Sequence, residues 1–286
     1  MNLSLFPAAG EIDSSIAIIC HRPTWTNPKQ GYYNLAVGDF CQMSSCSNQY
    51  SKDSSNTNNI SSKNQYYSEL TGLHAIANQT TITHNKITGL VHYRRRFLDP
   101  SNRIAYKLLQ KTIIDNAFNT FLGAQAESMH DKLVLQMELK KKSIAKMFKA
   151  QGRPLAILPK KSRFRKTLYE HYSLYHPRED IDACRTALAR IHPGYIESYD
   201  YTMNSKSMYC YNMIIAELDT IKGYSQWLFS LLSELENTLN FEILDKRVPY
   251  QRRAFGFLSE RLLNVYLLYH RGLAIKELPH AFLKTA

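Results

Sequence analysis

The fold of this chain is decided by two blocks, NISSKNQYYSEL (residues 59–70) and KITGLVHYRRRF (residues 86–97), which flank a helix-like run. The second block contains a short apolar strand over 87–91 that leads directly into the cationic segment HYRRR (92–96). Burying several cations costs free energy unless an anion lies against them. Open α/β sheets bind their ligands outside the carboxyl ends of strands. We therefore expect a phosphorylated ligand at the end of this strand.

The arginines of this segment suit such a ligand, because guanidinium groups bind phosphate oxygens in pairs and keep their charge at any working pH. Alternation along an extended segment would direct His92, Arg94 and Arg96 to one side of the strand. Tyr93 and Arg95 would then point to the other side. On this expectation the three arginines cannot all face one ligand. The alternative interpretation is a solvated surface run.

The overall charge also favours an anionic partner. The 286 residues include 36 basic and 24 acidic side chains, a formal net charge of +12. Nucleic acid, an anionic lipid surface or a phosphorylated substrate would each fit this excess. The 19 tyrosines and 12 phenylalanines could stack on bases. However, the sequence contains no nucleic-acid-binding motif, so we do not expect nucleic acid as a partner.

The cysteines and several missing motifs exclude further classes of protein. The five cysteines form no CxxC pair, which predicts free thiols in a reducing cytoplasm and disfavours a zinc site. No apolar run approaches the roughly 20 residues that span a bilayer. The N-terminus lacks the pattern of a signal peptide. Phosphate-loop, dinucleotide-binding, HExxH and GxSxG signatures are also missing from the sequence.

Hydrophobic patterns predict strands that alternate with helices. Besides 87–91, strands are expected at 15–20 (SIAIIC), 155–158 (LAIL) and 207–215 (SMYCYNMII). Helices are expected over 66–77, 181–191, 224–239 and 258–269. This alternation is typical of a mixed central α/β sheet flanked by helices.

Two further segments have distinct compositions. Residues 44–62 are rich in Ser and Asn, which predicts a mobile surface loop. Residues 104–150 look helical and become basic toward their end, at Lys140, Lys141, Lys142, Lys146 and Lys149. Such a run is typical of a solvated helix face. The alternative is a surface that lies on anionic lipid, where each basic residue adds about 1 kcal/mol.

Three polar features each have two interpretations. Asp180 and Asp182 form a DxD triplet that could hold a divalent cation, or could simply occupy the positive end of a helix. Glu260 could act as a general base, or could pair with Arg261 or Arg253. Asn212 lies between apolar residues, as either a satisfied buried amide or a group that hydrogen-bonds a substrate.

The chain resembles the bacterial DUF4422 family in four blocks of matching order and spacing: NISSKNQYYSELTGLHAI, ITGLVHYRRRF, YCYNMII with YSQWLFSLLSELE, and FGFLSERLLNVYL. The family comprises glycosyltransferases found among capsule, exopolysaccharide and lipopolysaccharide O-antigen genes. The similarity runs from the first strand to about Tyr269. Two segments depart from the family pattern: a basic helical insertion at about 100–151 and the loop at 44–58.

The resemblance implies a single GT-A-like domain, over residues 1–286, that binds a nucleotide-sugar. It implies transfer of a hexose, with galactofuranose as a candidate, from a UDP-linked donor to a lipid-linked, lipopolysaccharide or capsule glycan. The protein would lie in the cytoplasm, peripheral to the inner face of the bacterial inner membrane. Nucleic acid is not implied as a partner. Two alternative functions stay open, a basic module that binds nucleic acid and a catalytically inactive, transferase-like scaffold.

The resemblance also implies a role for individual residues. The first strand and its loop would hold the base and ribose, through Ile19, Cys20, His21 and Arg22. The helix before the central strand would add donor contacts from Lys63, Asn64, Tyr67 and Glu69. The segment of His92, Tyr93, Arg94 and Arg95 takes the place of the metal-binding DxD of other GT-A enzymes.

Fixed cations at that place would neutralise the leaving diphosphate. No metal cofactor would then be required, although Mn²⁺ or Mg²⁺ is possible, with Asp180 and Asp182 as the weaker alternative site. Asn212 would lie near the acceptor or the transferred sugar. Glu260 would take the proton from the acceptor hydroxyl in an inverting transfer.

Overall fold

The computed structural model describes residues 13–24, 28–43, 49–79, 87–99, 101 and 130–284. Its strands are β1 (Ser14–Cys20), β2 (Tyr32–Ala36), β3 (Tyr50–Lys52), β4 (Ile87–His92), β5 (Arg95–Phe97), β6 (Leu155–Pro159), β7 (Ser162–Arg163), β8 (Ser207–Met208), β9 (Ile214–Glu217), β10 (Ala274–Leu278) and β11 (His280–Phe282). Its helices are α1 (Asn64–Tyr67), α2 (Leu70–Ala77), α5 (Lys141–Lys149), α6 (Leu168–Tyr175), α7 (Arg178–Ile191), α8 (Ile196–Asn204), α9 (Leu218–Leu235), α10 (Phe241–Asp245), α11 (Pro249–Arg252) and α12 (Ala254–Tyr269).

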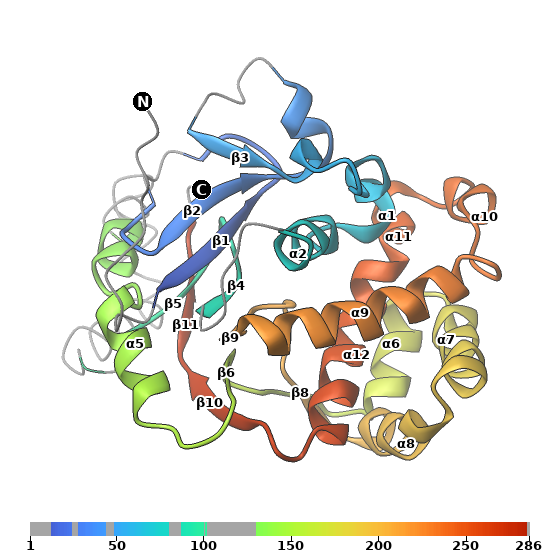
Figure 1. Cartoon of the computed structure of the whole chain (residues 1–286). Helices are drawn as coiled ribbons and strands as arrows, with labels where there is room; N and C mark the ends of the chain where they lie inside the picture. The colour runs from blue at the N-terminus through green and yellow to red at the C-terminus, as the bar shows by residue number, and fades with distance from the viewer. Residues whose placement is uncertain are drawn as a thin grey trace, which may run out of the picture.

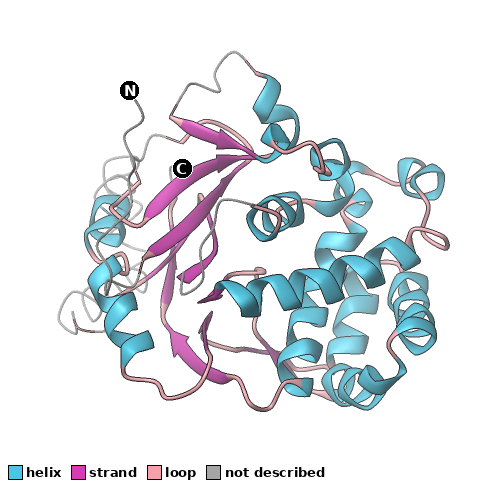
Figure 2. Ribbon diagram, in the orientation of Figure 1, coloured by secondary structure: helices cyan, strands magenta, loops and turns pink. Residues whose placement is uncertain are grey.

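Nine of these strands form one mixed sheet, with the order β10-β6-β9-β4-β1-β2-β3; in addition, β5 pairs with β4, and β11 pairs with β5 (Figure 1). β1, β2, β3 and β4 run parallel, so their carboxyl ends lie at one edge. β9 runs antiparallel between β4 and β6. The sheet is flanked by helices, with α5 on one side and the larger group that includes α2, α9 and α12 on the other (Figure 2). The mixed α/β fold class is confirmed.

β1 is apolar at every position from Ile16 onward because both of its faces are covered. Its side chains alternate between two cores. Ile16, Ile18 and Cys20 pack in the core that includes α5, whereas Ala17 and Ile19 pack in the core that includes α2, α9 and α12. The predicted strands at 15–20, 87–91 and 155–158 are thus confirmed as β1, β4 and β6.

Helix prediction succeeded where one apolar stripe covers a sheet or another helix. The helices expected over 181–191, 224–239 and 258–269 correspond to α7, α9 and α12. The prediction of one continuous helix over 66–77 is wrong in one respect, because the helix is interrupted. Ser68 has a φ of 53°, which ends α1 and starts α2 in a new direction.

Two other predictions from local composition are wrong in part. The loop expected at 44–62 contains β3, which pairs with β2, and a buried Asp53 that accepts a hydrogen bond from the Ser61 hydroxyl at 2.5 Å. Residues 44–48 lie outside the described part. The strand expected at 207–215 is instead β8 and β9, separated by a turn in which Tyr211 and Asn212 have φ values of 77° and 51°.

The proposed insertion at 100–151 lies largely outside the described residues. Residues 130–136 are helical, and α5 follows. In α5, Ile144 and Phe148 are buried, while Lys142, Lys146 and Lys149 are exposed on the other face. Among the described helices, none combines the length and the apolar character that crossing a membrane requires.

The expectation that the side chains of the arginine segment (92–96) alternate along one extended strand is also wrong. The chain turns at Tyr93 and Arg94, and β5 returns antiparallel to β4 with Arg95 opposite His92. Arg94 and Arg95 consequently line one cavity. Arg96 is instead 1% exposed, and its Nε lies 3.0 Å from a carboxylate oxygen of Glu138. The turn thus separates one structural arginine from two that face a ligand-sized space.

Candidate active site

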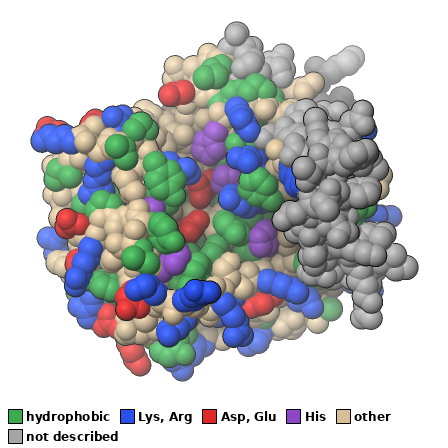
Figure 3. All heavy atoms as spheres, turned by 180° about the vertical axis from the view of Figure 1, so that it is seen from behind, with side chains coloured by type: hydrophobic (Ala, Val, Ile, Leu, Met, Phe, Trp, Pro, Cys, Tyr) green, Lys and Arg blue, Asp and Glu red, His purple; other side chains and the backbone are tan. Residues whose placement is uncertain are grey.

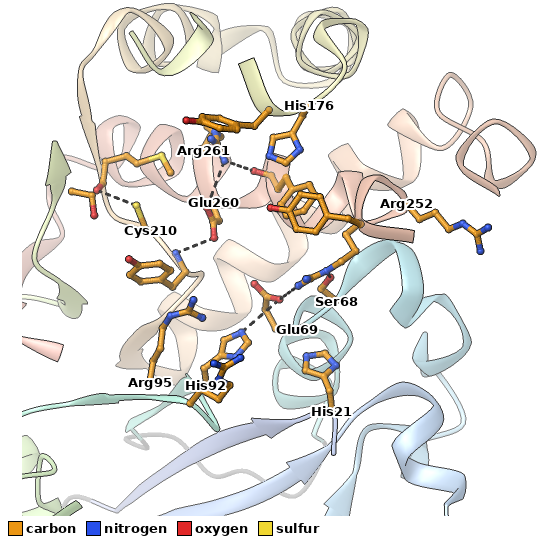
Figure 4. Close-up of a pocket in the computed structure, with 18 of the residues that line it drawn as sticks. His21, Ser68, Glu69, His92, Arg95, His176, Cys210, Arg252, Glu260 and Arg261 are labelled. Atoms are coloured by element: carbon orange, nitrogen blue, oxygen red, sulfur yellow. Dashed lines mark hydrogen bonds and ion pairs between the residues drawn. The ribbon is translucent and has the colours of Figure 1, made fainter. Parts of the chain in front are cut away.

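A cavity of about 840 Å³ opens where the parallel strands β1 and β4 end. The sheet contributes His21, which follows β1, and His92, the last residue of β4. Helices α6, α11 and α12 contribute the opposite wall. Figure 4 shows His21, His92 and Arg95 on the sheet side, with His176 and Arg261 across from them. A volume of this size suits a cofactor-sized or nucleotide-sized ligand.

Charged side chains and imidazoles dominate this part of the molecule. In Figure 3, histidine, basic and acidic side chains gather at the middle of the face, around a hollow. The basic residues that line the cavity are Arg94, Arg95, Arg252, Arg253 and Arg261. The carboxylates that line it are Glu69 and Glu260. Figure 4 shows the Arg252 side chain directed away from the others.

Arg94 and Arg95 are held by aromatic rings rather than by acids. The Arg94 guanidinium lies 4.4 Å from the centre of the Phe282 ring, and that of Arg95 lies 4.3 Å from the centre of the Tyr211 ring. Such stacking orients a guanidinium without neutralising it. Within the described part of the chain, neither arginine forms an ion pair, and Arg94 Nε is buried without a hydrogen-bond partner. Their charge is therefore available to an anionic ligand.

Glu69, at the start of α2, is the centre of a buried polar network. Its Oε1 accepts a hydrogen bond from Asn212 Nδ2 at 2.8 Å. Its Oε2 lies 3.8 Å from His92 Nε2 and 3.8 Å from a guanidinium nitrogen of Arg253. Burial opposes ionisation of Glu69, but these neighbours outweigh it and lower its pKa to about 2. Glu69 is therefore anionic at any working pH.

Glu260, on α12, is in a different environment. Its side chain is 22% exposed, and Oε1 accepts a hydrogen bond from the Tyr211 backbone N–H at 3.2 Å. Arg261 lies 3.5 Å from Oε2, so the pairing expected from the sequence is present. Burial nevertheless raises the pKa of Glu260, because the opposing effect of Arg261 is smaller and the charge of Glu69 adds to the increase. A raised pKa suits a group that must accept a proton.

Strained backbone surrounds the two carboxylates. Among the described residues, the non-glycine positions with positive φ are Ser68, Tyr211 and Asn212. Ser68 precedes Glu69, Asn212 donates to it, and the Tyr211 N–H donates to Glu260. Strain of this kind costs of order 1–3 kcal/mol per residue and persists where surrounding contacts enforce it. All three strained residues therefore adjoin or contact the two carboxylates of the cavity.

The imidazole of His21 completes the sheet side of the cavity. Burial, together with the neighbouring His92, lowers the pKa of His21 to about 4. The ring is therefore neutral at pH 7, and its Nε2 is buried without a hydrogen-bond partner. A ligand hydroxyl or phosphate oxygen could satisfy this atom.

The structure brings together only some of the residues singled out from the sequence. Those that line the cavity are His21, Asn64, Glu69, His92, Tyr93, Arg94, Arg95 and Glu260. Asn212 is 4% exposed and lies behind Glu69, where its amide also donates to Ser259 Oγ at 2.8 Å. It is therefore a buried amide that positions Glu69.

Five other residues do not line the cavity. Lys63 Nζ lies 2.6 Å from Glu236, and the Tyr67 hydroxyl donates to the same carboxylate at 2.6 Å. These two contacts join α1 to the end of α9. Arg22 is exposed, 5.4 Å from the centre of the Tyr93 ring. Ile19 and Cys20 are fully buried in the two cores.

The DxD triplet is placed in the first turns of α7, away from the cavity. Both Asp180 oxygens accept hydrogen bonds from Arg247 at 2.7 Å. Asp182 accepts from the Tyr169 hydroxyl at 2.8 Å and pairs with Arg178 at 3.5 Å. These carboxylates therefore do not fit a metal that bridges a diphosphate. Across the described ranges, no group of three or more His, Cys, Asp or Glu side chains could hold a metal ion.

Sequence reasoning missed several residues of the helical wall. Arg253 donates from Nε to Ser68 Oγ at 2.7 Å and so links α12 to the strained turn. Tyr175, Tyr250 and Phe257 also line the cavity. Tyr250 lies in a polar stretch with no motif, so nothing in the local sequence indicated it. The sequence offered Arg253 only as a partner for Glu260, whereas its guanidinium lies 3.8 Å from Glu69. Phe257 is part of the GFLSER block (256–261), which could have indicated it.

Comparison with known proteins identifies the chain at the level of family and fold. The chain belongs to the DUF4422 family, described as a domain of unknown function, whose model matches residues 15–271. No curated protein matches the sequence. A solved structure of the WbbM bifunctional glycosyltransferase, in its apo form, shares the fold with a TM-score of 0.71 at 22% identity. The match covers 96% of this chain but 46% of the other, so this chain spans about half the length of that protein.

Proposed function

We propose that the protein is a glycosyltransferase that uses a nucleotide diphosphate sugar. One observation carries the proposal: Arg94 and Arg95, which form no ion pair with a described residue, present their charge at the end of β4, and Glu260 faces the same cavity. A diphosphate and a proton-accepting carboxylate are the two requirements of direct glycosyl transfer. The fold shared with the WbbM bifunctional glycosyltransferase adds support.

In the proposed reaction, Arg94 and Arg95 bind the diphosphate of the donor. Glu260 takes the proton from the acceptor hydroxyl, and the hydroxyl oxygen bonds to the anomeric carbon. The bond from that carbon to the phosphate oxygen breaks, and the nucleoside diphosphate leaves with the electron pair. The guanidinium groups stabilise the negative charge that develops on the leaving oxygen. Because the hydroxyl attacks from the face opposite the departing phosphate, the anomeric centre is inverted.

We further infer that fixed cations fulfil the role that a divalent metal has in other transferases of this fold. Guanidinium pairs bind phosphate oxygens with strong, charge-assisted hydrogen bonds. Asp180 and Asp182 are engaged with Arg247 and Arg178, which supports this assignment. No step of the proposed reaction needs a metal cofactor.

The finer assignments follow the resemblance to glycosyltransferases of polysaccharide biosynthesis. The donor is a UDP-linked hexose, with galactofuranose as a candidate, and the acceptor is a lipid-linked, lipopolysaccharide or capsule glycan. The exposed basic face of α5, with Lys142, Lys146 and Lys149, favours attachment to the anionic inner face of the bacterial membrane. Each of these assignments can be tested separately.

Nucleotide binding tests the core of the proposal. UDP, GDP and dTDP are added to the wild-type protein, and unfolding temperature and calorimetric affinity are measured. A saturating nucleotide, at 100 times its Kd, stabilises a protein by about 2.7 kcal/mol. Arg94→Ala and Arg95→Ala each remove charge-assisted hydrogen bonds, so we expect affinity to fall about 10- to 100-fold.

Arg153→Ala is the matched control. Arg153 is exposed in the loop before β6, at the edge of the sheet opposite the cavity. Its loss removes the same charge but leaves the site unchanged, so affinity is expected to stay within about twofold of wild type. Unchanged affinity in both Arg94→Ala and Arg95→Ala would remove the diphosphate assignment.

A further inference from the structure

Two exposed tyrosines line the cavity on its helical side. Tyr175, the last residue of α6, is 60% exposed, and Tyr250, in α11, is 57% exposed. Exposing large rings to water forgoes the free energy of burying them. Rings left open in this way at the mouth of a cavity are available to a ligand.

A second layer of contacts fixes the positions of these tyrosines. The Tyr250 ring lies 5.0 Å from that of Phe257, on which His176 stacks at 4.0 Å. Gln251 joins the two helices, because its Nε2 donates to the Tyr175 carbonyl at 2.7 Å and its Oε1 lies 3.0 Å from His176 Nδ1. The mouth is therefore a preorganised aromatic surface, which binds a ligand at a lower entropic cost than mobile side chains do.

This surface adjoins the proton acceptor rather than the diphosphate site. Phe257 and Glu260 are three positions apart on α12, so they share one face of the helix. His176, which stacks on Phe257, lies across the cavity from Arg95 (Figure 4). A general base must contact the hydroxyl that it deprotonates. The molecule that carries this hydroxyl must consequently lie against the wall that α12 forms.

We propose that Tyr175 and Tyr250 form the acceptor subsite and bind the terminal sugar ring of the acceptor glycan. The inference rests on the proposed function. One face of a sugar ring presents C–H groups, which pack on an aromatic face, while its hydroxyls point outward to water and polar side chains. Imidazoles and guanidinium groups around the tyrosines interrupt the apolar area that a lipid chain would need. The subsite therefore recognises the sugar and not the lipid.

Saturation-transfer NMR tests this subsite without turnover. The probes are the methyl pyranosides of galactose, glucose, mannose, rhamnose and N-acetylglucosamine, each with and without saturating UDP. In the wild type we expect transfer to the ring C–H protons of at least one probe. Tyr175→Ala and Tyr250→Ala should each weaken its binding about fivefold or more, and the Phe variants should retain it. Tyr201→Ala, a 69% exposed tyrosine on α8 outside the cavity, is the control and should behave as wild type.

Each other outcome overturns one specific statement. Absence of transfer to every probe, or transfer that persists in both Ala variants, refutes the acceptor subsite. A loss of UDP affinity in the Ala variants also refutes it, because the rings would then hold the nucleobase. If the wild type binds a sugar at these tyrosines but binds none of UDP, GDP and dTDP, the proposed function fails and the sugar site stands.

Discussion

At Glu69 and Glu260, the surroundings act in opposite directions on two identical side chains. Glu69 is held as an anion by an amide, an imidazole and a guanidinium, whereas burial raises the pKa of Glu260. Divergent pKa values in one cavity are a common sign of divided roles in acid–base chemistry. We assign the positioning role to Glu69 and the proton transfer to Glu260.

The first prediction concerns the pH dependence of transfer. Because a base acts only when deprotonated, the rate should fall as pH decreases through the raised pKa of Glu260. Glu69 has a pKa of about 2 and adds no inflection at neutral pH. Glu260→Gln should lower kcat by about 10²–10⁴-fold and abolish the acidic limb, while UDP affinity stays near that of wild type.

The control for this prediction is Glu197→Gln, an exposed carboxylate at the start of α8. It should leave both the rate and its pH profile unchanged. A Glu260→Gln variant with an intact acidic limb would show that another group accepts the proton.

The second prediction concerns Asn212 and the anion that it contacts. Asn212→Asp places a carboxylate beside Glu69, about 2.8 Å away if the side chain keeps its position. Two buried carboxylates in contact share a proton at low pH and repel each other once both ionise. The pKa of the new group is therefore raised on folding, so the variant should be destabilised progressively as pH rises from 4 to 8, by urea denaturation.

Asn212→Ala provides the comparison. It removes the hydrogen bond to a charged group, at a cost of about 1.5–3 kcal/mol, but introduces no charge. Its loss of stability should vary little between pH 4 and 8. Identical pH profiles for the two variants would contradict the contact between Asn212 and an ionised Glu69.

Among single elements, β4 depends on its closeness to β9. A Cβ added at Gly89 would lie 2.0 Å from the Ile214 carbonyl oxygen, which is backbone and cannot move aside easily. Gly89→Ala should therefore separate these strands and lower the free energy of unfolding by about 1–3 kcal/mol, measured by urea denaturation. Gly152→Ala is the matched control, since its Cβ would meet no atom within 4 Å. Equal stability of the two variants would contradict this packing.

Most regular elements could be predicted from the sequence because their apolar residues repeat at the period of a strand or a helix. β1, β4 and β6 have continuous apolar runs, and α9 and α12 have broad apolar stripes. The errors occur where contacts distant in the chain decide the backbone. Ser68 accepts a hydrogen bond from Arg253, so no local pattern indicated the break in the helix at Ser68. Asn212 donates a hydrogen bond to Glu69, so no local pattern indicated the turn between β8 and β9.

The candidate site could be predicted only in part, for the same reason. The cations at the end of β4 were evident, because charge following an apolar strand is a local signal. Their individual roles were not, because the turn at Tyr93 and Arg94 directs Arg96 into the core beside Glu138. The aromatic wall of Tyr175, Tyr250 and Phe257 forms because α6, α11 and α12 pack together. No short stretch of sequence indicates this packing.

In the whole molecule, the proposed reaction takes its permanent cations from the sheet edge and its base from the helical layer. If guanidinium groups replace a metal, chelation should not matter. We expect UDP affinity and transfer rates in 5 mM EDTA to match those in 5 mM Mn²⁺ within about twofold. A strict requirement for Mn²⁺ would contradict this replacement.

The stacking of Arg94 and Arg95 on aromatic rings, rather than pairing with acids, has a consequence for product release. Their charge cannot be relieved by losing a proton, and among the described residues no acid forms an ion pair with either guanidinium. A freed nucleoside diphosphate carries more negative charge than the sugar ester from which it came. The released nucleoside diphosphate should therefore bind more tightly than the nucleotide-sugar donor, so that product inhibition limits the steady-state rate. Adding a phosphatase that destroys the nucleotide should then accelerate steady-state turnover.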